Sequence, residues 1–62
     1  MSFVLQLNDT PPLYWVMSSK IAPVGHWGER TEAIQFAREK DATAFMNIHL
    51  RHQAEQCKVI EV

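Results

Sequence analysis

The apolar residues of this chain follow two different periods, and the change between them limits the folds that it can adopt. Residues 3–7 alternate, with Phe3, Leu5 and Leu7 on one side, which is the period of a half-buried strand. Between Ala42 and Leu50, apolar side chains recur every three or four residues, as on one face of a helix. The two periods together predict an α+β fold.

Three segments have the composition of strands. Residues 2–8 and 13–18 are separated by Asp9-Thr10-Pro11-Pro12, which predicts a turn because proline fixes φ and cannot donate to a sheet. We expect these two strands to form an antiparallel hairpin, and residues 57–62 to form a third strand. Residues 19–30 predict a connecting loop with a short extended piece near residues 21–24.

Residues 31–53 have a helical composition, but one straight helix does not fit them. On a helical wheel, Phe36 lies far from the apolar arc that Phe45 and Leu50 define, so a single helix would expose it. We therefore expect a break between Ala37 and Asp41, with a short helix or turn before it. The main helix after the break would be capped by Asp41 or a close neighbour.

These elements predict a three-stranded antiparallel sheet with one main helix on one face, in the order β-β-(short α)-α-β. The C-terminal strand is expected to pair with the first strand, which leaves the second strand at an edge. The 62 residues predict a single domain (1–62), which at this size buries only about 60% of its unfolded surface. One cysteine cannot close an internal disulfide, so apolar packing must supply the stability.

Charge and cysteine usage bear on location and partners. Six basic residues against seven acidic ones give a net charge of -1, and the lack of a basic stripe argues against nucleic-acid binding. A nucleic-acid accessory protein using Arg30, Arg38, Lys40 and Arg51 is the alternative. The lone thiol, the absence of a signal-peptide pattern and the lack of a span of about 20 apolar residues predict a cytoplasmic protein that binds no membrane.

Two histidines and the cysteine form the one cluster that suggests chemistry: His49, His52 and Cys57. A structural zinc site needs four converging ligands, and this spacing lacks the usual second pair. We expect His49 to be a core histidine held by one hydrogen bond, with no metal and no cofactor bound. A Cys–His nucleophile would also need oxyanion donors and a cleft, so we predict that the protein is not an enzyme. A metal- or thiol-dependent protein is a second alternative.

A set of apolar positions resembles short ββαβ accessory proteins of phages and prophages. They follow a hairpin and precede a terminal strand: Trp27, then Ala33-x-x-Phe36, then Asp41-Ala42-x-x-Phe45. The resemblance spans roughly residues 3–62 and implies the ββαβ fold and a mobile-element origin. It implies no particular activity, because such proteins have mixed functions; anti-defence proteins such as anti-CRISPRs are of this size.

The aromatic second strand predicts a binding surface. If Trp15 faces the helix, then Tyr14 and Val16 face away from it beside Val4, on a sheet face that one helix cannot cover. Trp27, between two glycines, either closes the core with its indole N–H bonded to backbone or reaches a partner. The predicted partner-binding site consists of Tyr14, Val16, Val4 and Trp27. The expected function is to occlude a host protein, and the same surface or the strand edge would allow a homodimer.

Overall fold

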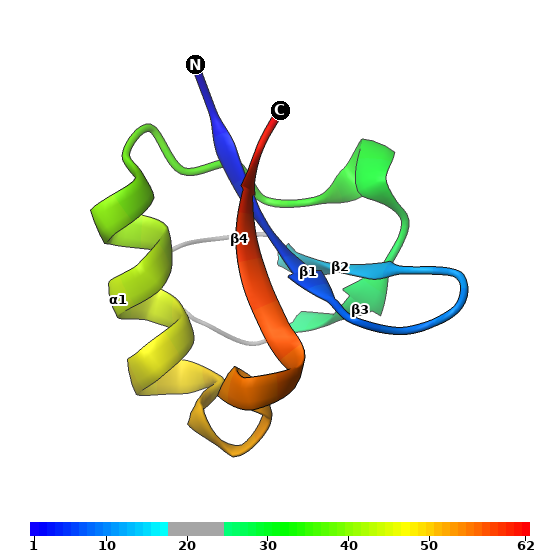
Figure 1. Ribbon diagram of the computed structural model, residues 1–62. Helices are drawn as coiled ribbons and strands as arrows, with labels where there is room; N and C mark the ends of the chain where they lie inside the picture. Colours follow the sequence, from blue (N-terminus) through cyan, green and yellow to red (C-terminus); the bar gives the residue numbers. More distant parts are fainter. Residues whose placement is uncertain (18–24) are drawn as a thin grey trace.

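Four antiparallel strands form one sheet in the computed structural model, which describes residues 1–17 and 25–62 (Figure 1). The strand order is β3-β2-β1-β4. The strands are β1 (Phe3–Leu7), β2 (Leu13–Met17), β3 (Gly25–Gly28) and β4 (Cys57–Glu61). The α+β class and the antiparallel arrangement are confirmed, but the predicted count of three strands is wrong because β3 lies in the expected loop. The extended piece predicted at 21–24 lies outside the described residues.

Strand pairing follows the prediction on one side of the hairpin and departs from it on the other. The C-terminal strand β4 pairs with β1 along its whole length, from Phe3 opposite Glu61 to Leu7 opposite Cys57, as expected. The second strand was predicted at an edge, and this is wrong. Strand β3 covers that side of β2, with Trp27 opposite Trp15. The edges of the described sheet are therefore β3 and β4.

The segment between β3 and the main helix enters the sheet rather than forming a helix of its own. A short 3-10 turn covers Arg30–Glu32, and the chain is extended after it. Ile34 then donates a backbone hydrogen bond to Trp15, and Phe36 exchanges two with Phe3. Residues 34–36 are thus inserted between β1 and β2, which pair with each other only at Leu7 and Gln6. The helix or turn predicted at 31–36 is therefore shorter and earlier than expected.

The main helix α1 (Glu39–His49) begins where the apolar phase changes, so the predicted break is confirmed. Arg38 precedes it with an extended backbone and no side-chain cap, so the expected cap at Asp41 or a neighbour is wrong. The helix also ends earlier than Gln53: the backbone N–H of Leu50 bonds to Met46, and a 3-10 turn, η2 (Arg51–Gln56), leads into β4.

The core lies between α1 and one face of the sheet (Figure 1). The sheet contributes Leu5, Trp15 and Met17, and the helical side contributes Ala42 and Leu50. Phe36 is 5% exposed and completes this cluster, as the phase argument required. Its ring also packs on Phe45, with ring centroids 5.5 Å apart.

Candidate functional site

The strand register fixes which side chains point away from the core. Paired residues of antiparallel strands share a face, and the core residues Leu5 and Trp15 mark the covered one. We call the other face of the sheet the open face. Four of its residues form a row across all four strands: Gly28, Tyr14, Gln6 and Lys58. A second group lies beside the row: His26, Val16, Val4 and Ile60.

Tyr14 lies in the middle of the open-face row, as the alternation of the second strand predicted. Its ring is half-buried, and its hydroxyl accepts a hydrogen bond of 3.0 Å from Nε2 of Gln6 on the neighbouring strand. Gly28 lies opposite Tyr14 on the other side, where the side chains of Val16 and His26 lie over the glycine. Tyr14 is therefore held in place by a side chain of the neighbouring strand.

Val16 and Ile60 add apolar surface to the open face, and polar residues surround them. Both side chains are half-buried, and Val16 is paired with the exposed His26. Lys58 is exposed at the β4 end of the row. The face therefore combines an aromatic centre and aliphatic neighbours with Gln6, His26 and Lys58 at its margins. Such a combination is typical of protein interfaces.

Val4 does not contribute accessible surface, which corrects its predicted role. It lies on the open face opposite Ile60, but it is only 1% exposed. Its neighbour Phe3 pairs with the inserted segment at Phe36, so β1 is flanked on both sides at this point. The sequence argument placed Val4 on the correct face and missed its burial, because nothing in the alternation indicates that residues 34–36 enter the sheet.

Trp27 lies on the covered face, opposite Trp15, and closes the end of the core. The two indoles meet edge to face with centroids 5.3 Å apart. Nε1 of Trp27 donates a 3.0 Å hydrogen bond to the side chain of Gln53 in η2, rather than to backbone as the core interpretation expected. In contrast, Nε1 of Trp15 is buried and has no partner in the described part of the chain. The half-buried Trp27 joins β3 to η2 and lies on the opposite side of the sheet from Tyr14.

The histidines and the cysteine do not come together. His49 is exposed, so its prediction as a core histidine is wrong; its ring packs on Phe45 with centroids 4.6 Å apart. His52 is exposed in η2, and Cys57 is half-buried in β4, where burial raises the pKa of its thiol. Across residues 1–17 and 25–62, His, Cys, Asp and Glu side chains form no group of three that could hold a metal ion.

The basic residues of the nucleic-acid alternative lie on separate elements. Arg30 lies in the turn after β3, Arg38 precedes α1, Lys40 is in its first turn and Arg51 begins η2. All four are exposed. Acidic neighbours accompany them along the chain, among them Glu29, Glu32 and Glu39.

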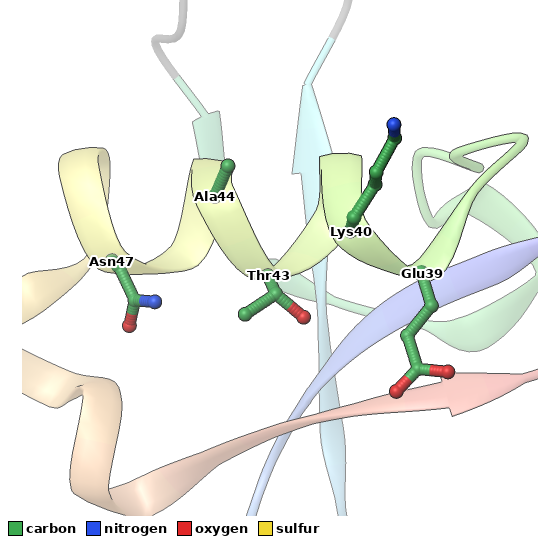
Figure 2. Close-up of a pocket in the computed structure, with 5 residues that line it drawn as sticks. All are labelled: Glu39, Lys40, Thr43, Ala44 and Asn47. Carbon is green, nitrogen blue, oxygen red and sulfur yellow. The ribbon is translucent and has the colours of Figure 1, made fainter.

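A shallow depression runs along one flank of α1 (Figure 2). All its lining residues belong to the helix: Glu39, Lys40, Thr43, Ala44 and Asn47. Figure 2 shows Glu39, Thr43 and Asn47 pointing to the side of the helix on which β4 runs. The depression is open to solvent, so it does not enclose a small molecule in the way that an active-site cleft does.

Comparison with protein-family models, curated proteins and solved structures finds no match for the chain. The described helices are all too short or too polar to cross a bilayer. The site is therefore defined by its geometry alone. Gln6, Gly28 and Lys58 were not predicted as site residues. Gln6 alternates with Leu5 and could have been found by its opposite phase, whereas Gly28 required the unforeseen strand β3.

Proposed function

We propose that this protein is a small, non-enzymatic protein-binding protein that uses the open face of its sheet, with Tyr14 as the main contact residue. The observation that carries the proposal is the position of Tyr14. It is an aromatic side chain held by a hydrogen bond to the neighbouring strand, on the face of the sheet opposite to the one on which α1 packs.

Several physical features of this position favour protein binding. Tyrosine supplies a large contact area and one hydrogen bond at a small cost in conformational entropy, and it is enriched among the residues that dominate binding energies. The bond from Gln6 fixes the Tyr14 hydroxyl before binding, so less ordering is needed in the complex.

The proposed mode of action is occlusion of a host protein. The resemblance to phage and prophage accessory proteins motivates this choice of partner, and an anti-defence inhibitor such as an anti-CRISPR is its most concrete form. A standard protein interface buries roughly 800 Å² on each partner. Binding of that size masks a functional surface of the partner without any chemistry.

The experiment is an affinity capture with matched variants. The wild-type protein, Tyr14→Ser and Ile48→Ser are used to capture partners from a host lysate. Ile48 is the control because it is 67% exposed on α1, away from the open face. We expect one protein to be retained by the wild type and by Ile48→Ser and lost by Tyr14→Ser. Equal retention by all three would contradict the proposal.

A further inference from the structure

Strand β4 has a free edge whose backbone groups can be assigned from the ladder. Val62 donates to Ser2 and Asn8 donates to Gln56, so the even-numbered residues of this strand bond to β1. The N–H and C=O groups of Val59 and Glu61 therefore point away from β1. None of the described strands pairs with that side of β4.

The spacing of these free N–H and C=O groups allows them to pair with the same groups on β4 of a second copy. When a second β4 is placed antiparallel beside the first, Val59 of one copy faces Glu61 of the other, and each pair exchanges two backbone hydrogen bonds. The two N–H and two C=O groups of Val59 and Glu61 on each copy are then all hydrogen-bonded. Ile60 meets its own equivalent on the open face, and the two sheets become one.

The position of α1 supports the same arrangement. The helix packs on both β1 and β4, so it covers the β4 side of the sheet. In such a pair the two helices would lie on the same face of the joined sheet, one on each side of the new strand pair, with one flank of each facing the other.

The helix flank that would form this contact suits close packing. Phe45 packs on Phe36 toward the middle of the sheet, so the opposite flank faces the β4 edge (Figure 2). That flank presents Glu39, Thr43 and Asn47, of which only Glu39, at the start of the helix, is charged. In antiparallel helices, the Glu39 end of one flank meets the Asn47 end of the other, so no like charges are paired.

We infer that the protein forms a symmetric homodimer through β4 and the Thr43 flank of α1. The dimer carries two open faces side by side on one eight-stranded sheet. This inference does not depend on the proposed function, because Tyr14 lies outside the dimer contact.

Sedimentation velocity at about 0.1–1 mM protein, a range that detects even weak dimers, tests this inference. Glu61→Pro removes an outward N–H while leaving the β1 ladder intact, and Glu61→Ala is its control. Thr43→Lys places a charge in the helix contact, and Ile48→Lys is its control on the exposed side of α1. Melting temperatures confirm that each variant is folded.

We expect a dimer for the wild type and both controls, and at least a tenfold weaker association for Glu61→Pro and Thr43→Lys. The Tyr14→Ser variant should dimerise normally, which separates this result from the binding test. A monomeric wild type, or a dimer unaffected by Thr43→Lys and by a folded Glu61→Pro, would overturn the inference.

Discussion

Phe3 and Phe36 exchange two backbone hydrogen bonds of 2.8 Å, and this pairing determines the shape of the sheet. It holds residues 34–36 between β1 and β2, where Ile34 also bonds to Trp15. The same segment brings the Phe36 ring onto Phe45 and directs the chain into α1. One extended segment thus connects the sheet, the core and the helix.

Replacing Phe36 by alanine should lower the free energy of unfolding by about 3–5 kcal/mol, as deletions of buried aromatic rings do. Because a domain this small has little stability to lose, the variant should be largely unfolded at room temperature. Chemical denaturation followed by circular dichroism measures the effect. Gln35→Ala, at the exposed neighbouring position, should change stability by less than about 0.5 kcal/mol. Equal stabilities for the two variants would show that the inserted segment does not hold the core.

The hydrogen bond between Trp27 and Gln53 should contribute to the stability of the fold. Gln53→Ala should cost about 1 kcal/mol, because it removes a partly buried hydrogen bond between β3 and η2. Trp27→Phe keeps a ring against Trp15 and loses the same bond. If the two side chains act through that bond, the double variant should be less destabilised than the sum of the single ones. Strict additivity in a double-mutant cycle would argue against the link.

His49→Ala should have a small effect on stability, below about 1 kcal/mol. The reason is exposure: the ring loses only its contact with Phe45 and leaves no buried polar group unpaired. The sequence interpretation of His49 as a core residue required a larger loss. Thermal melting of His49→Ala beside the core variant Leu50→Ala distinguishes the two, since Leu50 is buried.

Because of the Cys57 thiol, we expect the free energy of unfolding to fall at alkaline pH. Burial raises the pKa of this thiol in the folded chain, so the unfolded chain loses its proton at lower pH. The contribution to stability is present below the ordinary cysteine pKa of about 8.5 and is lost as pH rises through the folded pKa. Urea melts at pH 7 and pH 10 should show a larger decrease for the wild type than for Cys57→Ala. An identical decrease in both would contradict the assignment.

Periodicity alone was sufficient for much of the fold. The alternation of Phe3 and Leu5, the break before α1 and the pairing of β4 with β1 all follow from side-chain patterns that reflect burial. The strand β3 could not be predicted, because four residues with a glycine at each end show no alternation. Its place in the sheet comes from the Trp15–Trp27 contact, which is a tertiary feature.

Periodicity also predicted part of the candidate site, and tertiary contacts determine the rest. Alternation placed Tyr14 and Val16 on the correct face, since it depends only on the strand. It also placed Val4 on the correct face but missed its burial, and it could not decide between the core and partner interpretations of Trp27, whose surroundings depend on η2. His49 was misassigned because the helical wheel gives only the direction in which its side chain points. The exposure of that side chain also depends on where the helix ends relative to the sheet.

The most direct test of the account is the affinity of the captured partner for wild type, Tyr14→Ser and Ile48→Ser, measured together with their melting temperatures. We expect Tyr14→Ser to melt close to the wild type and to bind more weakly by about 2 kcal/mol or more, because Tyr14 is the proposed main contact residue of the open face. Ile48→Ser should bind like the wild type. A Tyr14→Ser variant that is folded and binds with unchanged affinity would contradict the claim that the open face is the binding surface.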